Sequence, residues 1–198
     1  MEKPFAKPAA AALALAALLT LGACTSSRPG AAPSLNPVYV TNAKKITLLS
    51  PENMVGSVES LMLFTGSFGD QQFSTPVYVQ ADELSLVLLL VNDFGVSMGS
   101  LNYDGMSAEL DAPLFPPSLK AEYIIADFQN AYYDVAALES NYEASHLTFE
   151  QELRDDGSEV RRVLSGSTVV ETIIRTDGRL VIDNHLRGYT YTLVEADE

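Results

Sequence analysis

The side chains that most often perform nucleophilic catalysis are scarce in this sequence of 198 residues. It contains one cysteine, Cys24, and two histidines, His146 and His185, and neither histidine lies in a recognisable catalytic motif. A nucleophilic hydrolase needs a base and an orienting acid beside an activated serine or cysteine. One cysteine and two histidines are also too few for a structural zinc site. We therefore expect a protein that is not an enzyme and that uses no metal or other cofactor.

The charged residues are strongly unbalanced. The sequence has 26 acidic and 12 basic side chains, which gives a formal net charge of -14. Such a surface repels a phosphate backbone, so nucleic acid is not expected as a partner. Because carboxylates are so abundant, a glycosidase-type pair of acid and base stays open as an alternative that the sequence cannot test.

The basic residues have one local concentration, at Arg154, Arg161 and Arg162 around the turn Asp155-Asp156-Gly157. Two interpretations of this cluster are open. The arginines can pair across neighbouring strands with acidic residues, or they can contact a lipid head group. The acidic residues available for cross-strand pairing are Glu150, Glu152 and Glu159.

The first 24 residues carry the most specific chemical signal. Residues 1–8 include two lysines, residues 9–21 form an apolar run, and Leu21-Gly22-Ala23-Cys24 follows it. The run is shorter than the roughly 20 residues that span a bilayer, so it predicts a secretory signal at residues 1–23. The four residues that end it resemble a bacterial lipobox, which implies that Cys24 is the lipidation site and anchors the protein to a membrane.

A change of composition then separates a tether from a folded domain. Residues 24–37 comprise the acylated cysteine and a segment rich in Ser, Pro, Ala and Gly, which is typical of a flexible linker. Thr25 follows the cysteine where, by resemblance to enterobacterial lipoproteins, Asp would signal retention at the inner membrane. We therefore expect localisation at the outer membrane, facing the periplasm, with residues 38–198 as the domain.

Short apolar segments separated by turns predict an antiparallel sheet in that domain. Asp-Gly pairs end the predicted turns at Gly105, Gly157 and Gly178. The segment 84–91, with its run LVLLLV, is expected to be buried on both faces, and residues 38–57 cannot be assigned. The predicted strands are residues 58–66, 72–80, 84–91, 96–102, 106–111, 146–154, 158–165, 167–175, 179–184 and 188–195.

One segment interrupts the strands and predicts a helical insert. After Pro116 and Pro117, Ser118 is a plausible N-cap, and the apolar spacing changes from two residues to about 3.6. Asp134 is expected to cap a second short helix. Together these features predict an α+β fold, in which the helical insert plugs the concave side of a curved antiparallel sheet. The stripe of the first helix consists of Ala121, Ile125, Phe128 and Tyr132.

The order of these elements resembles LolB, an outer-membrane lipoprotein that receives lipoproteins from a periplasmic carrier. Leu88-Leu89-Leu90-Val91-Asn92-Asp93-Phe94-Gly95 is similar to the LolB stretch in which a leucine triplet precedes a protruding apolar residue. The carboxyl half resembles a family of LolB-like lipoproteins, some of which are encoded beside enzymes of aryl polyene synthesis. The tryptophans of the amino-terminal part of LolB are missing here. The resemblance implies a LolA/LolB-like half-barrel, that is, an incomplete β-barrel closed by the helical insert around an apolar cavity. It also implies a periplasmic carrier protein as a partner.

The resemblance assigns membrane or cargo insertion to Phe94, at the tip of a predicted hairpin; the alternative is that Phe94 folds back onto its own strands. The expected function is binding an acyl or other hydrophobic ligand and aiding its delivery. A scaffold lipoprotein without ligand is the alternative, and a hydrolase is a third. The sequence leaves open whether the interior residues line a cavity or fill a core. These residues are Leu88, Leu90, Ile125, Phe128, Tyr132, Tyr189 and Tyr191.

Overall fold

The computed structural model describes residues 35–68, 71–113, 115 and 119–196. All of them belong to one compact unit, Pro33–Glu198. This unit has its own hydrophobic core, so we expect residues 33–198 to fold without the preceding segment. The predicted signal, Cys24 and most of the predicted tether lie outside the described residues.

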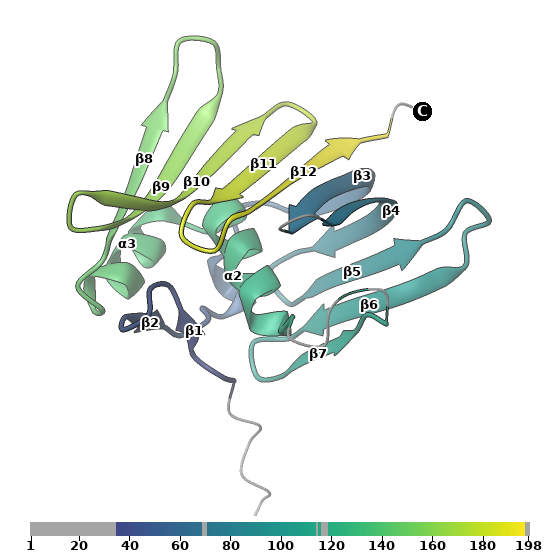
Figure 1. Ribbon diagram of the computed structural model, residues 1–198, viewed down its shortest axis with the longest axis horizontal. Helices are drawn as coiled ribbons and strands as arrows, with labels where there is room; N and C mark the ends of the chain where they lie inside the picture. The colour runs from purple at the N-terminus through teal and green to yellow at the C-terminus, as the bar shows by residue number, and fades with distance from the viewer. Residues whose placement is uncertain (1–34, 69–70, 114, 116–118, 197–198) are drawn as a thin grey trace, which may run out of the picture. The chain divides into compact units, whose positions relative to one another are not determined.

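A ten-stranded antiparallel sheet dominates the described chain (Figure 1). Its strand order is β7-β6-β5-β4-β3-β12-β11-β10-β9-β8, and every neighbouring pair is antiparallel. The strands are β3 (Val58–Phe68), β4 (Gln71–Ala81), β5 (Leu86–Val91), β6 (Ser97–Tyr103), β7 (Ala108–Asp111), β8 (Thr148–Leu153), β9 (Glu159–Ser165), β10 (Thr168–Thr176), β11 (Arg179–Asn184) and β12 (Tyr189–Glu195).

The sheet consists of two meanders of five strands each, joined where β3 pairs with β12. In this seam Phe64 lies opposite Leu193, and Gly66 lies opposite Tyr191. The outermost strands are β7 and β8, which are consecutive in the chain. The segment between them must therefore cross from one edge of the sheet to the other. The sheet stays open at β7 and β8 and does not close into a barrel, in agreement with the predicted incomplete closure.

The two helices form this crossing segment. Helix α2 (Ala121–Tyr132) contacts β7 near one edge and β10 near the other, and α3 (Val135–Glu143) packs on β8 (Figure 1). Asp134 caps α3 as predicted, because its side chain accepts a hydrogen bond from the Ala137 amide at 3.0 Å. The N-cap position of α2 is Lys120, and the predicted cap Ser118 lies outside the described residues.

The predicted strands are confirmed to within about two residues at their ends. One expectation for β5 is wrong, because the strand is not buried on both faces. Leu86 is buried, but Val87, Leu89 and Val91 remain half-exposed, and Leu84 lies in the preceding turn with 72% exposure. The reason is that the helices cover one face of the sheet only, so alternate side chains of β5 face water.

The unassigned residues 38–57 cover the outer side of the helices. They contain β1 (Val38–Tyr39), β2 (Lys45–Ile46) and the 3-10 helix η1 (Pro51–Asn53). The Leu49 amide donates to the side chain of Gln129 in α2, and the Gln129 amide donates back to the Leu49 carbonyl. Helix α2 is therefore enclosed between the sheet and this segment.

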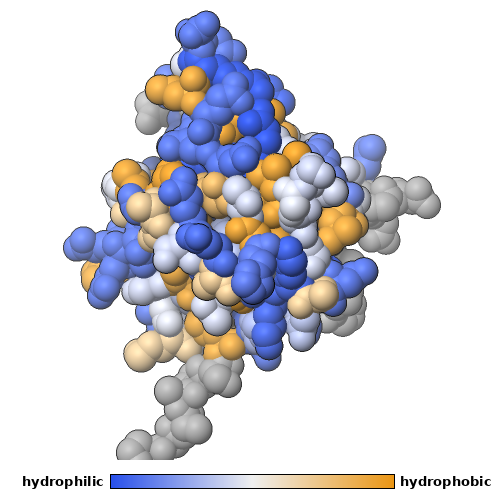
Figure 2. Space-filling model, turned by 90° about the vertical axis from the view of Figure 1, so that its left-hand side faces the viewer, coloured by the Kyte–Doolittle hydropathy of each residue, from blue (hydrophilic) through white to orange (hydrophobic). Residues whose placement is uncertain are grey.

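The β8–β9 hairpin carries the predicted arginine cluster. Arg162 pairs with Glu152 at 2.9 Å, Arg154 lies 3.6 Å from the same carboxylate, and Arg161 pairs with Glu159 at 2.6 Å. Cross-strand pairing is thus confirmed for Arg162 of β9 with Glu152 of β8, whereas Arg161 and Glu159 pair within β9. Figure 2 shows this hairpin as a mainly hydrophilic projection at the top of the view.

Candidate functional site

The face of the sheet that α2 covers encloses an apolar cavity of about 120 Å³. Strands β3 to β7, β11 and β12 supply one side of its wall, and α2 with the preceding connection supplies the other. Wide, mostly apolar concavities with few polar groups are typical of sites for small hydrophobic ligands. The polar lining residues are Ser100, Asp127, Tyr123, Tyr189 and Tyr191.

Five of the seven predicted interior residues line this cavity: Leu88, Leu90, Phe128, Tyr189 and Tyr191. The other two lie elsewhere. Ile125 is completely buried in the core, and Tyr132 lines a second, more polar cavity that includes Arg175 and Arg179. Both residues are on α2, where the cavity wall is formed instead by Tyr123, Ile124, Asp127 and Phe128.

Aromatic rings make up one part of the wall. Phe64 of β3 packs against Phe115 and Tyr191, with ring centroids 6.2 and 5.6 Å apart. The position between them on the seam is Gly66, where an added Cβ would lie 2.9 Å from the Phe64 ring and 3.2 Å from the Tyr191 Cβ. Any larger residue at this position would therefore clash with the Phe64 and Tyr191 side chains, so glycine allows both to pack here.

The sequence analysis missed the most unusual residue of the wall, Asp127. Its carboxylate accepts hydrogen bonds from the Tyr189 hydroxyl, at 2.8 Å to Oδ2, and from the Tyr191 hydroxyl at 3.2 Å. Burial, followed by the charge of Glu171, raises the pKa of Asp127 well above its usual value. The hydrogen bonds from the two tyrosines act against this shift. The carboxyl group is therefore held in an environment that favours its neutral form.

Glu171 of β10 is a second buried carboxyl group, although it does not line the cavity. It accepts hydrogen bonds from Asn130 Nδ2 at 3.1 Å and Asn184 Nδ2 at 3.2 Å. Burial raises the pKa of Glu171 to about 7, although these hydrogen bonds oppose the change. Asn184 also lies 3.3 Å from the Tyr189 hydroxyl, so both acids belong to one polar network between α2 and the sheet.

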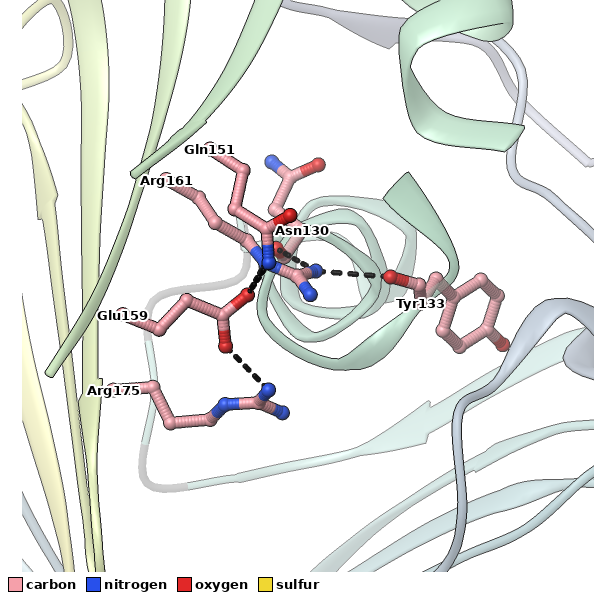
Figure 3. A network of polar contacts seen from close by, with 6 residues as sticks. All are labelled: Asn130, Tyr133, Gln151, Glu159, Arg161 and Arg175. Carbon is pink, nitrogen blue, oxygen red and sulfur yellow. Dashed lines mark hydrogen bonds and ion pairs between the residues drawn. The ribbon is translucent and has the colours of Figure 1, made fainter. Parts of the chain in front are cut away.

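A second network, which shares Asn130 with the first, fixes the C-terminal end of α2 (Figure 3). Arg161 Nη1 donates to the carbonyl oxygens of Asn130 at 3.0 Å and Tyr133 at 2.9 Å. A cation at the last carbonyls of a helix also interacts favourably with the helix dipole. Glu159 pairs with both Arg161 and Arg175. Burial alone would raise the pKa of Glu159, but these arginines hold it below its usual value.

Phe94 lies at the tip of the β5–β6 hairpin and is 90% exposed. It therefore does not fold back onto its own strands. Asn92 Oδ1 accepts hydrogen bonds from the amides of Phe94 and Val96, which orders the turn. Leu90 of the cavity wall is four residues away, and four residues span at most about 14 Å even when the chain is fully extended. The exposed ring thus lies near the cavity.

Neither histidine lines the cavity. His146 is in the turn before β8 with a positive φ of 56°, so it does not begin that strand as predicted, and His185 is in the β11–β12 turn. Within the described ranges, no group of three or more His, Cys, Asp or Glu side chains could hold a metal ion. None of the described helices is long and apolar enough to cross a membrane.

Comparison with known proteins gives one family. A family model described as "Protein of unknown function (DUF3261)" matches residues 62–197, which include all strands of the sheet from the middle of β3 onward. The match therefore covers the cavity walls and both helices. No curated protein matches the chain.

Proposed function

The chain belongs to the DUF3261 family of proteins of unknown function, and from its own geometry we propose that it binds an acyl chain or similar hydrophobic ligand and aids its delivery to a membrane. The observation that carries this proposal is the apolar cavity between α2 and the sheet. A dry engineered cavity of about 150 Å³ can hold benzene, so a cavity of about 120 Å³ has room for an apolar group of similar size.

Phe94 supports the delivery part of the proposal. An exposed aromatic ring at a hairpin tip is unfavourable in water and gains free energy when it enters an apolar phase. Its place near the cavity would bring the ligand close to the surface that the ring enters.

The finer parts of the proposal rest on resemblance. The open sheet covered by helices agrees with a LolA/LolB-like half-barrel. We extend the proposal to a lipid anchor at Cys24 in the outer membrane, facing the periplasm, and to exchange with a periplasmic carrier protein. Incorporation of labelled palmitate into the wild-type chain but not into Cys24→Ser tests the anchor. Labelling of Cys24→Ser, or none in the wild type, would contradict it.

Ligand binding can be tested with a tryptophan placed in the cavity. The chain has no tryptophan, and Leu88 faces the cavity from β5. We expect Leu88→Trp to occupy much of the cavity and to weaken binding of a fluorescent fatty acid by at least about tenfold. The matched control is Leu89→Trp, on the opposite face of the same strand, which should bind like the wild type. Equal binding by both variants would contradict the proposal.

A scaffold that carries no ligand is the second candidate, and a different surface favours it. Leu61 and Leu63 of β3 and Val194 of β12 are 47%, 45% and 40% exposed on the sheet. Register places Leu63 opposite Val194, so these side chains form one apolar group at the seam. Organic extraction of the purified protein separates the candidates, because a carrier should release a bound hydrophobe and a scaffold should not.

A further inference from the structure

Arg187, in the turn between β11 and β12, differs from most arginines of the described chain. Arg154, Arg161, Arg162 and Arg175 each pair with a carboxylate. Arg187 forms no ion pair within the residues that the structure describes, although the protein carries a net charge of -14. A cation without an anion in so acidic a protein is available for a ligand.

The surroundings hold this guanidinium group in one position. Its Nη2 donates to the carbonyl oxygen of Tyr39 and, at 3.5 Å, to the Tyr123 hydroxyl. The guanidinium carbon lies 4.6 Å from the centroid of the Tyr123 ring, which is a cation–π contact. Nε and Nη1 donate to none of the described residues. The arginine is thus fixed while several of its donors remain open to an anion.

The position of Arg187 is at the edge of the apolar cavity. Tyr123, whose ring contacts the guanidinium group, is part of the cavity wall, and so is Tyr189, two residues after Arg187. The charge of Arg187 also lowers the pKa of Asp127 in that wall, against the larger effects of burial and of Glu171. The guanidinium group therefore contacts a residue of the cavity wall directly.

We propose that Arg187 binds the anionic head group of an amphiphile, part of whose apolar chain enters the cavity. This inference rests on the proposed function and narrows its ligand class to chains that end in a carboxylate or a phosphate. An anionic oxygen accepts charge-assisted hydrogen bonds from a guanidinium group, and these are stronger than bonds between neutral groups. The cavity supplies the hydrophobic part of the affinity and Arg187 the selectivity for charge.

Calorimetric titration of residues 33–198 with decanoate, decyl phosphate and decanol tests the inference. The three probes share one chain length and differ in the head group. We expect the two anions to bind about tenfold more tightly than decanol at low salt, since a hydrogen bond to a charged group contributes that order of affinity. The advantage should shrink as salt is added. Inorganic phosphate alone should not bind at millimolar concentration.

Variants of Arg187 complete the test. Arg187→Gln should remove the preference for the anions and leave the affinity for decanol unchanged. Arg187→Lys keeps the positive charge, so it should retain part of the preference for the anions. The control is Arg154→Gln, at an exposed arginine outside the cavity wall, which should change none of the affinities.

Three other results are possible, and each would refute a different part of the argument. Equal affinities for all three probes, unchanged in Arg187→Gln, would refute the role of Arg187 and leave the proposed function intact. Inorganic phosphate binding as tightly as decyl phosphate would show an ion site unrelated to the cavity. Failure of every probe to bind would refute the proposed function itself.

Discussion

Among single residues, Asp127 in the cavity wall and Glu171 in the same polar network are the most informative. Both carboxyl groups are buried, and neither has an ion-pair partner within the described ranges. Burying a charge without a partner is costly, so both groups favour their neutral forms. A ligand that enters the cavity thus meets a wall that is apolar with a few hydrogen-bonding groups.

Glu171 should make the stability of the fold depend on pH. Between the usual pKa of a glutamate and about 7, the folded protein holds a proton on Glu171 that the unfolded chain has released. The free energy of unfolding should therefore fall as the pH rises through this range. We expect Tm to decrease by more than about 3 °C between about pH 5 and about pH 8. In Glu171→Gln this dependence should be much weaker; an identical slope would contradict the assignment.

Arg161 should be far more important for stability than its neighbour Arg162. Arg161 is buried and connects Glu159 to the last carbonyls of α2, whereas Arg162 pairs with Glu152 at the surface. We expect Arg161→Met to lower the free energy of unfolding by about 3 kcal/mol or more. Arg162→Met should cost less than about 1 kcal/mol. Urea denaturation measures both, and equal costs would show that the network in Figure 3 is not needed for stability.

The sequence predicted which residues of α2 are interior but not which of them face the cavity. The stripe of Ile125, Phe128 and Tyr132 has helical spacing, and all three are buried. However, the sheet covers one side of α2 and the segment around Leu49 covers another, so nearly the whole helix is buried. The spacing of apolar residues along α2 cannot distinguish the side that faces the sheet from the side that faces the segment around Leu49. The signal that could have revealed Asp127 is its place between Ile124 and Phe128, on one helical face.

At the scale of elements, the β5–β6 hairpin allows a matched test of membrane insertion. Phe94 and Leu84 are exposed apolar residues in the turns at opposite ends of β5. Phe94→Glu should slow ligand transfer to liposomes by about tenfold, because burial of a Phe side chain is worth about 1.5–3 kcal/mol. Leu84→Glu should transfer at the wild-type rate.

Thermal stability is the second measurement for this pair of variants. Neither side chain contributes to the core, so both proteins should melt close to the wild type. If Leu84→Glu slowed transfer as much as Phe94→Glu, general surface charge would explain the effect and the insertion role would be wrong.

Turn motifs and the spacing of apolar residues were enough to predict most strands of the sheet. Gly105, Gly157 and Gly178 have positive φ angles of 87°, 83° and 64°, as the predicted turns require. The segment 38–57 gave no such signal. Its two strands have two residues each and pair only with one another, and its other contacts, such as Lys44 with His146, join residues far apart in the sequence. Local periodicity carries no information on contacts of that kind.

At the scale of the whole molecule, the open sheet should unfold from its edges. Strands β7 and β8 each pair on one side only, whereas β3 and β12 form the seam at the centre. Hydrogen exchange should therefore be slowest in the seam and fastest in β7, a strand of four residues. Faster exchange in β12 than in β7 would contradict this order of stability.

The sequence predicted an open antiparallel sheet with a helical insert, but not its strand order. Hairpin turns define which consecutive strands pair, and they account for each meander. The pairing of β3 with β12 joins residues more than a hundred positions apart. This pairing brings the two halves of the sheet together under α2. A contact between segments so far apart in the sequence leaves no local pattern from which it could be predicted.

The seam between β3 and β12 also determines when the apolar cavity can form during synthesis of the chain. Tyr189, Tyr191 and Leu193 belong to β12, which comes last in chain order among the ten strands of the sheet and joins its two halves. A nascent chain that does not yet include β12 has an incomplete cavity wall and no contact that joins the two halves of the sheet. The cavity can therefore form only after β12 has been synthesised, however early the other strands pair.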